Sequence, residues 1–423
     1  MRYPRAIVPV ALAVVGGSAA LVPAFAGARS CPLAPLIPCD ALRPPGVTPE
    51  PEPSPGARAP AKVKPPLSIG LTESDPRLLV PGGTASRAAV KVAALRPAYI
   101  RVLVPWERFQ PRAAQAPDWD TPPGGCPDTA TRCASDLGLR GLLRAIKRRQ
   151  DADGGWKILV VPYFTPPWAA SRITGCQRAR NRRARAQMPL IGPYREFLRR
   201  LNALADTVGV KIDYVTPWNE PNYPAFLQPQ RATCNSRSKA IAPLAYAKLA
   251  RAARHVLRPD QTLVLGSLAG FAGPRTYGAG AAEFIRGLPR DVACIDGPFA
   301  QHAYVGERSR HGRAPVRANP AAAARYDLID EVLAALDAKG CPQVKQLWIA
   351  ETGTFDHRCE AMSAALRSWA DHDRIDAAFQ YTFREAQAFP VGLVSPSLRE
   401  TYKSYRAWMA FAGGPEKLPP NPC

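Results

Sequence analysis

Two glutamates stand directly after apolar, β-branched runs, in positions where a carboxyl group could do acid–base chemistry. Glu220 lies in the sequence VTPWNEPN and Glu351 in the sequence LWIAETGTF. Two carboxyl groups can share the cleavage of a glycosidic bond. One protonates the leaving oxygen, and the other, about 5 to 5.5 Å away, attacks the anomeric carbon. The two glutamates are 131 positions apart (351 minus 220), so the fold has to bring them together.

The runs before these glutamates belong to a set of eight. Short apolar or β-branched segments occupy residues 67–71, 98–104, 157–163, 214–218, 262–267, 297–304, 346–350 and 377–383. They recur about every forty residues, as strand–helix units do. Between these runs, apolar residues recur at spacings of three and four, as on one face of a helix, over residues 139–146, 194–201, 246–256 and 328–336. Alternating strands and helices favour a parallel sheet.

Eight units in about 350 residues fit a closed (β/α)8 barrel, a TIM barrel of the α/β class, better than an open doubly wound sheet. No G-x-G-x-x-G sequence opens the first unit. Asp136 is placed to cap the helix near residue 139, while Gly209 and Gly340 are placed to end later helices. Reactive groups of a barrel stand at the carboxyl ends of its strands, and strands four and seven face each other across the mouth. Glu220 and Glu351 would therefore meet there.

The WNEP sequence at residues 218–221 resembles the Asn-Glu-Pro signature of the clan A glycoside hydrolases, the 4/7 superfamily. The resemblance extends over the whole barrel, from about residue 67 to residue 411. It implies a retaining glycosidase that acts on a β-linked glycan. In such an enzyme Glu220 is the general acid/base, Glu351 is the nucleophile, and Asn219 binds the sugar 2-hydroxyl.

Further residues carry the same resemblance. Arg101, in YIRVLVPW, resembles the clan arginine that keeps the nucleophile ionised. His302 and Tyr304, in QHAY, resemble the pair after the sixth strand. There the tyrosine orients the nucleophile and the histidine shapes the sugar subsite. The run VVPYFTPPWAA at residues 160–170 is similar to the third-strand end of family 39 and of family 5-like members. Arg101 could instead pair with a core carboxylate, and a buried histidine that donates to a backbone carbonyl would look the same as His302.

Aromatic residues near the predicted rim could bind the apolar faces of sugar rings. Trp168 and Trp218 are the two that we expect to contact the substrate. Clan members commonly have a tryptophan platform at the end of strand eight, whereas FQYTFRE offers Tyr381 or Phe383 there. This departure leaves the identity of the sugar open.

Three other glutamates fall near strand ends and could replace one of the chosen pair, namely Glu73, Glu107 and Glu385, although none has matching neighbours. Two other functions also remain open. A non-catalytic glycan-binding barrel would bind without turnover, and a transglycosylase would pass the covalent intermediate to a sugar instead of water.

The chain is basic, with 56 Lys plus Arg against 34 Asp plus Glu and a net charge of +22. Such a charge favours anionic surfaces and acidic ligands. The basic residues are scattered, and the chain has no zinc-finger, helix-turn-helix or RNA-recognition motif, so we expect no specific nucleic-acid partner. The Arg-rich segment at residues 177–187 follows the third strand. Two interpretations of it are open, a clamp that binds acidic glycans and a solvated basic loop. The expected partner is an oligo- or polysaccharide, which could be acidic.

No cofactor or metal ion is expected. The five histidines show no His-Glu-x-x-His spacing of the kind that zinc enzymes use. A G-x-S-x-G elbow, which would indicate a serine hydrolase, is also missing from the sequence.

The chain begins with features of a secreted protein. Residues 1–28 predict a signal peptide, with a retained anchor as the alternative, and the proline-rich residues 29–66 predict an extended linker. Residues 67–413 predict one catalytic domain, and residues 414–423 a C-terminal tail. We expect a secreted monomer, either free or associated with the cell envelope, without a transmembrane domain in the mature chain.

Ten cysteines, an even number, indicate disulfides formed in an oxidising compartment. Sequence alone leaves their connectivity open. Proximity and the barrel arrangement suggest the pairs Cys31 with Cys39, Cys126 with Cys133, Cys176 with Cys234, Cys294 with Cys341, and Cys359 with Cys423.

Overall fold

The computed structural model describes residues 66–80, 86–122, 137–172, 174–176, 184–270, 278–305, 329–386, 389–412 and 422–423. The chain divides into the units Met1–Val63 and Lys64–Cys423, and the described residues all belong to the second. The predicted signal peptide, the predicted linker up to residue 65 and residues 413–421 lie outside them. Among the described residues, none of the helices combines the length and the apolar character that crossing a membrane requires.

The strands overlap the eight predicted apolar runs, with ends that differ by up to three residues, and the fifth run forms two short strands. They are β1 (Ser68–Thr72), β2 (Tyr99–Pro105), β3 (Lys157–Tyr163), β4 (Ile212–Val215), β5 (Thr262–Leu263), β6 (Leu265–Leu268), β7 (Phe299–His302), β8 (Leu347–Thr352) and β9 (Ile375–Tyr381). All the pairs are parallel, in the order β5-β4-β3-β2-β1-β9-β8-β7-β6.

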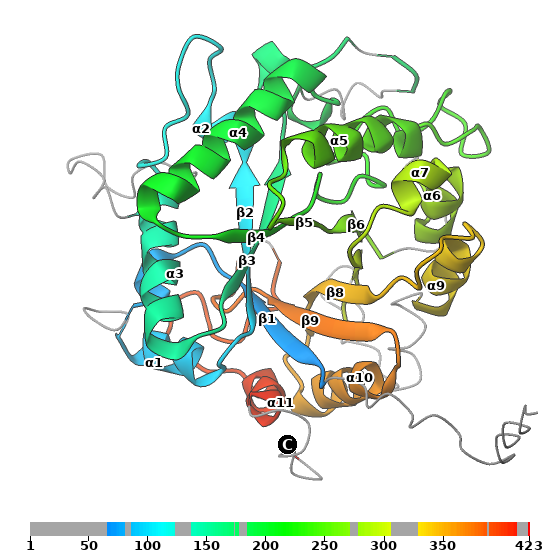
Figure 1. The fold of residues 1–423 in the computed structure, drawn as a ribbon. Helices are drawn as coiled ribbons and strands as arrows, with labels where there is room; N and C mark the ends of the chain where they lie inside the picture. Colours follow the sequence, from blue (N-terminus) through cyan, green and yellow to red (C-terminus); the bar gives the residue numbers. More distant parts are fainter. Residues whose placement is uncertain are drawn as a thin grey trace, which may run out of the picture. The chain divides into compact units, whose positions relative to one another are not determined.

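The sheet closes into a barrel at the fifth run. β5 pairs with β4 and β6 pairs with β7, and only Val264 separates β5 from β6 in the chain. The Val264 N–H donates to the Val215 carbonyl at 2.9 Å, and the Leu265 N–H donates to the Pro298 carbonyl at 3.2 Å. One short segment therefore joins both edges of the sheet, which confirms the predicted (β/α)8 barrel (Figure 1).

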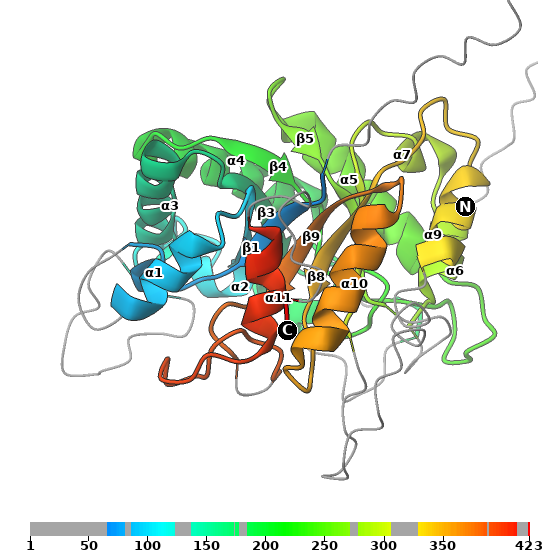
Figure 2. The same ribbon diagram turned by 90° about the horizontal axis from the view of Figure 1, so that it is seen from below.

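Helices surround the strands (Figures 1 and 2). They are α1 (Ser86–Ala94), α2 (Trp106–Phe109), α3 (Leu139–Asp153), α4 (Ile191–Val208), α5 (Ala242–Val256), α6 (Ala281–Gly287), α7 (Arg290–Ala293), α9 (Ile329–Asp337), α10 (Cys359–Asp371) and α11 (Ser404–Phe411). Short 3-10 helices span Pro76–Leu78, Pro167–Ala169 and Ala184–Ala186.

The predicted helix ends are partly right. Gly209 ends α4 with a φ of +73°, a conformation that glycine adopts without strain, and Gly340 follows α9 with a φ of +61°. The prediction for the start of α3 was wrong. Its N-cap is Gly138, without a side-chain cap, and Asp136 lies outside the described residues.

Aromatic side chains fill the barrel below its mouth. Trp348 lies with its ring centroid 4.9 Å from that of Tyr99, 4.8 Å from that of Tyr214 and 5.6 Å from that of Phe379. The backbone of Gly70 lies against the Phe379 ring, where an added Cβ would stand 2.3 Å from a ring carbon. This packed layer makes the barrel a solid core, so reactive side chains have room only above it, at the carboxyl ends of the strands.

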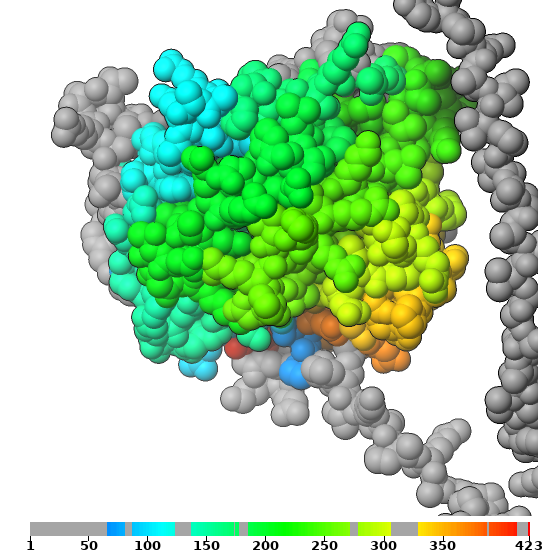
Figure 3. All heavy atoms as spheres, turned by 45° about the horizontal axis from the view of Figure 1, so that its top comes forward, coloured from blue at the N-terminus to red at the C-terminus, as the bar shows by residue number. Residues whose placement is uncertain are grey.

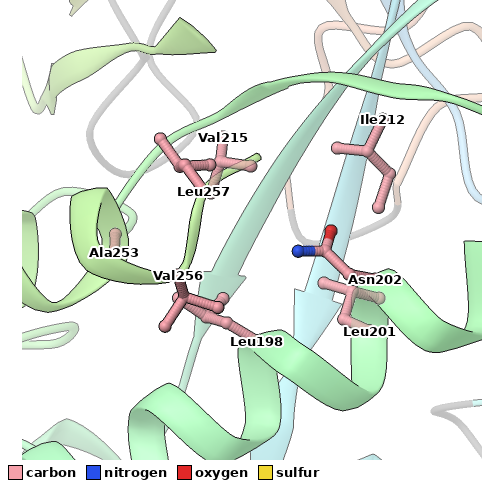
Figure 4. A pocket seen from close by; sticks show the side chains of 8 residues that line it. All are labelled: Leu198, Leu201, Asn202, Ile212, Val215, Ala253, Val256 and Leu257. Carbon is pink, nitrogen blue, oxygen red and sulfur yellow. The ribbon is translucent and has the colours of Figure 1, made fainter. Parts of the chain in front are cut away.

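The outer layer is also well packed. In Figure 3, α4 and α5 (green) form one continuous surface that adjoins the yellow-green segment of α6 and α7. A gap of about 10 Å³ lies between α4, α5 and β4, which is room for one water molecule at most. Figure 4 shows the side chains that line it. Its lining is apolar apart from Asn202, so this gap is a packing imperfection and no substrate site.

Three of the predicted disulfides are confirmed: Cys176–Cys234, Cys294–Cys341 and Cys359–Cys423. The last joins the final residue of the chain to the first residue of α10, and Figure 2 shows the C-terminus beside α10 and α11. The predicted pairs Cys31 with Cys39 and Cys126 with Cys133 lie outside the described residues.

Candidate active site

The two predicted catalytic glutamates lie together at the mouth of the barrel. Glu351 is on β8, in register with His302 on β7. Glu220 follows β4 and has a φ of +39°, and its N–H donates to the Ser267 carbonyl at 2.9 Å. A carboxylate oxygen of Glu220, one of Glu351 and a ring nitrogen of His302 all lie within 4.8 Å of one another. This spacing suits a retaining glycosidase, because inverting enzymes hold their carboxyl groups about 6.5 to 9.5 Å apart.

Arg101 connects the nucleophile candidate to Asn219. Its guanidinium is fully buried, with Nη1 2.7 Å from Glu351 Oε1. Nη2 donates to Asn219 Oδ1 at 2.7 Å. Arg101 does pair with a buried carboxylate, as the alternative interpretation expected. That carboxylate is Glu351, the expected nucleophile, so the two interpretations of Arg101 agree. The contact between Asn219 and a sugar hydroxyl stays a prediction.

Both oxygens of Glu351 are held. Arg101 binds Oε1, and the Tyr304 hydroxyl donates to Oε2 at 2.5 Å. Burial by itself would raise the pKa of Glu351, but the attraction of His302 and Arg101 and the hydrogen bonds from Tyr304 and Arg101 outweigh it. The pKa of Glu351 therefore lies below its ordinary value of 4.5, and the side chain is ionised at neutral pH.

His302 lies between the two carboxyl groups. Its Nδ1 is 2.9 Å from Glu220 Oε1 and 3.3 Å from Glu351 Oε2. Its Nε2 is 2.8 Å from the hydroxyl oxygen of Ser267. The ring is buried, and both nitrogens face side chains, so the alternative of a histidine that donates to a backbone carbonyl does not describe it.

The pKa values of the two carboxyl groups are shifted in opposite directions. Burial raises the pKa of Glu220 above 4.5, against the opposing effects of the hydrogen bond and charge of His302. The pKa of Glu351 is lowered by its positive neighbours. Opposite shifts of this kind favour a proton on Glu220 over one on Glu351, and retaining glycosidases use a division of that kind.

The prediction that Trp218 contacts sugar was wrong. Its side chain is fully buried, its Nε1–H donates to the Phe226 carbonyl at 2.8 Å, and its ring packs edge-on against Tyr194. Neither ring face is free for a ligand, so Trp218 supports the loop that carries Glu220. Trp168 is half-buried against Trp106, with its Nε1–H on the Gln110 carbonyl, and its sugar contact stays a prediction.

The end of β9 carries a tyrosine in place of the usual tryptophan platform. Tyr381 is half-buried, with its ring 6.4 Å from that of Tyr304 and 5.8 Å from that of Phe389, whereas Phe383 is fully buried. Phe355 completes this group, 5.3 Å from Phe389. Sequence reasoning missed Phe389, because it lies in a loop without a regular spacing that would mark it.

A second aromatic group lies at the ends of β3 and β4. Phe164 and Phe226 stack with centroids 5.5 Å apart and an angle of 7° between their planes. The guanidinium of Arg185 covers Phe164 at 4.5 Å and lies 3.7 Å from a Glu107 oxygen. Within the Arg-rich segment, Arg185 thus has two partners of its own, and residues 177–183 lie outside the described residues.

A cavity of about 440 Å³ opens between the loops that follow β1 and β2. Its lining includes the charged residues Glu73, Asp75 and Arg77. Tyr163 also lines it, and this tyrosine interacts electrostatically with Arg101 and Glu351. The volume falls within the range of small-molecule sites, about 300 to 1,000 Å³. The mouth therefore extends beyond the two central carboxyl groups.

The other candidate glutamates have structural partners. Glu73 accepts from the N–H groups of Ser74, Asp75 and Arg384 and so joins the loops after β1 and β9. Burial nevertheless raises its pKa to about 7. Glu385 lies 2.5 Å from His357 Nε2 and accepts from Tyr402, and Glu107 faces Arg185.

The side chains of Glu220, His302 and Glu351 are also close enough together to bind a divalent cation. Arg101, however, places a positive charge 2.7 Å from Glu351, and like charges at that range repel strongly. The donor set suits proton transfer better than metal binding.

Comparisons of sequence find no family model and no curated protein that match the chain. Solved structures do match. A GH39 β-xylosidase from Caulobacter crescentus is 17% identical, with a TM-score of 0.53, over 82% of this chain and 72% of that one. A GH5_18 protein from Bifidobacterium longum subsp. longum, in complex with Manβ1-4GlcNAc, is 12% identical, with a TM-score of 0.50, over 82% and 78%.

An exo-β-1,4-mannosidase from Opitutaceae bacterium strain TAV5 is 15% identical with a TM-score of 0.48, and the match covers 84% of this chain but only 60% of the mannosidase. Identities this low speak for the fold, and the first two matches cover the barrel. The chain therefore shares the (β/α)8-barrel fold of the GH39 β-xylosidase and the GH5_18 protein.

Proposed function

We propose that this protein is a secreted retaining glycoside hydrolase. The observation that carries the proposal is a pair of carboxyl groups whose oxygens lie within 4.8 Å and whose pKa values are shifted in opposite directions, that of Glu220 upward by burial and that of Glu351 downward by His302, Arg101 and Tyr304. Arg101 and Tyr304 stabilise the ionised form of Glu351, while burial favours the protonated form of Glu220.

The reaction has two steps. In the first, a Glu351 oxygen attacks the anomeric carbon, the bond from that carbon to the leaving oxygen breaks, and Glu220 gives its proton to the leaving oxygen. In the second, Glu220 takes a proton from water, the water oxygen attacks the anomeric carbon, and the ester bond to Glu351 breaks. Both carboxyl groups return to their starting states.

The test uses activated aryl glycosides. We expect Glu351→Ala to lose turnover by a factor on the order of 10⁴. Glu220→Ala should stall in deglycosylation and regain rate with azide, which attacks without needing a base. Glu196→Ala, an exposed glutamate on α4 paired with Arg200, serves as the control and should keep full activity. Unchanged activity in either Glu220→Ala or Glu351→Ala would remove the proposal.

The charge of the mouth cavity keeps both neutral and acidic β-glycosides in the screen. Its lining holds Glu73 and Asp75 but also Arg77, whose Nη2 lies 2.7 Å from Asp75 Oδ2. The names of the structural neighbours, a β-xylosidase and a protein bound to Manβ1-4GlcNAc, put aryl β-xylosides and β-mannosides first in a screen. β-Glucosides, β-galactosides and β-glucuronides complete it, and the glucuronide tests the acidic alternative.

Transfer to a sugar would use the same covalent intermediate. Product analysis at high acceptor concentration separates it from hydrolysis. Three disulfides fit an oxidising compartment and support secretion, which a cell-fractionation experiment would test.

A further inference from the structure

A serine outside the predicted site contacts both the acid/base candidate and its histidine. Ser267 lies on β6 and is fully buried. Its carbonyl accepts from the Glu220 N–H at 2.9 Å, and its hydroxyl oxygen is 2.8 Å from His302 Nε2. Its φ of +55° is unusual for a residue other than glycine, asparagine or aspartate. A buried serine in this conformation is held there by its surroundings.

The surroundings of His302 decide where its proton lies. Nδ1 faces oxygens of both carboxyl groups, at 2.9 and 3.3 Å. Once Glu220 has given up its proton, both of these oxygens are acceptors, and a lone pair at Nδ1 would point at them. The neutral ring therefore carries its hydrogen on Nδ1, which leaves a lone pair on the buried Nε2. Only a donor satisfies that lone pair, and Ser267 is placed to be this donor.

We infer that Ser267 is a positioning residue that acts on Glu220 through His302. Resting on the proposed function, the inference adds a residue that the resemblance did not include. Ser267 donates its hydroxyl hydrogen to Nε2, and this polarises the ring so that Nδ1–H binds the ionised Glu220 more strongly. The chain of bonds from Ser267 through His302 supports Glu220 whenever it has given up its proton. The Ser267 carbonyl holds the backbone of the same glutamate.

The first experiment needs no substrate. The chain has five histidines, so imidazole nitrogen resonances of ¹⁵N-labelled protein can be resolved, and the His302 signals are those missing in His302→Gln. We expect the Nε2 resonance of His302 to move in Ser267→Ala and in Ser267→Gly. An Nε2 resonance in the same position in both variants would overturn the inference, whatever the enzyme assays show.

The second experiment is the pH profile of kcat/KM with an aryl glycoside that the wild type hydrolyses. Without the serine donor the ionised Glu220 is less stabilised, so the basic limb should move up by roughly half a pH unit, and the optimum kcat/KM should fall about tenfold. Ser267→Gly tolerates the positive φ, so it separates the hydroxyl from the backbone. Equal losses in the alanine and glycine variants support the hydroxyl, whereas a glycine variant with wild-type activity would refute its role.

A double-mutant cycle tests the route. In a His302→Ala background, Ser267→Ala should cause no further loss of kcat/KM, because its path to Glu220 is already cut. Independent losses that multiply would contradict action through His302. Ser363→Ala, a buried serine in α10, is the matched control and should leave the pH profile unchanged. A wild-type protein that cleaves no glycoside would refute the proposed function. The resonance experiment would still show whether the Ser267 hydroxyl binds His302 Nε2.

Discussion

Replacing Arg101 with methionine tests how the protein keeps a buried carboxylate ionised. Methionine has a similar length and no charge, so it removes the guanidinium that stands 2.7 Å from Glu351 Oε1 while filling much of the space. Two unit charges about 4 Å apart interact by about 4 kcal/mol at an effective dielectric constant of about 20. At about 1.36 kcal/mol per pH unit, that corresponds to about 3 units of pKa.

The pKa of Glu351 should therefore rise in Arg101→Met, because burial then acts against fewer opposing groups. His302 and Tyr304 remain, so the expected rise is between about 1 and about 3 units. The nucleophile has to be ionised, so the acidic limb of kcat/KM against pH should move to higher pH by the same amount. The assay is a pH–rate profile with an aryl glycoside substrate.

Stability should change with pH as well. In the wild type the lowered pKa of Glu351 stabilises the fold above the ordinary value of 4.5, and that contribution is lost as the pH falls through the folded value. In Arg101→Met the higher pKa of Glu351 shrinks this contribution, so the variant loses more stability relative to the wild type above pH 4.5 than below it. Losing one partner of a buried ion pair costs about 3 to 5 kcal/mol, and we expect this cost near pH 8 and a smaller one near pH 4.

Arg231→Met is the matched control. Arg231 is buried and binds Glu283 through two hydrogen bonds of 2.9 and 2.7 Å, away from the catalytic pair. It should also lower stability in urea denaturation, but it should leave the acidic limb where it is. An acidic limb in Arg101→Met that coincides with the wild type would show that Arg101 does not set the ionisation of Glu351.

Three further predictions follow from single contacts. Tyr304→Phe removes the donor to Glu351 Oε2, so the pKa of Glu351 should rise and the acidic limb of the pH–rate profile should move up by about 1 unit; a lower pH for that limb would contradict the assignment. Replacing Cys294 and Cys341 together by alanine opens a 47-residue loop and should reduce the free energy of unfolding in urea by about 4 kcal/mol, whereas an unchanged midpoint would mean that the bond adds nothing. Trp218→Phe loses a buried hydrogen bond and should reduce stability by about 1 kcal/mol with no change in KM, and a higher KM would restore its role as a sugar contact.

Much of the fold could be predicted from the sequence, because the strands and helices of a barrel each have a local pattern of apolar residues. Each strand is a short apolar run and each outer helix an apolar stripe, so eight repeating units predict the barrel and the ends where reactive groups stand. Glu220 and Glu351 follow from the same logic, with the Asn-Glu-Pro resemblance to choose among the glutamates at strand ends. The alternation by itself did not distinguish Glu220 from Glu73 or Glu385.

Tertiary structure decided what depends on neighbours distant in sequence. Trp218 reads as a rim aromatic, yet both of its faces are covered by packing that no local pattern encodes. Ser267 has no motif, because its partners His302 and Glu220 are 35 and 47 positions away and meet it only when β6 and β7 pair and the β4 loop folds over them (302 minus 267; 267 minus 220). Local sequence determines which elements form, since propensity and periodicity act over a few residues, whereas burial and proton sharing at the site are set by the whole closed barrel.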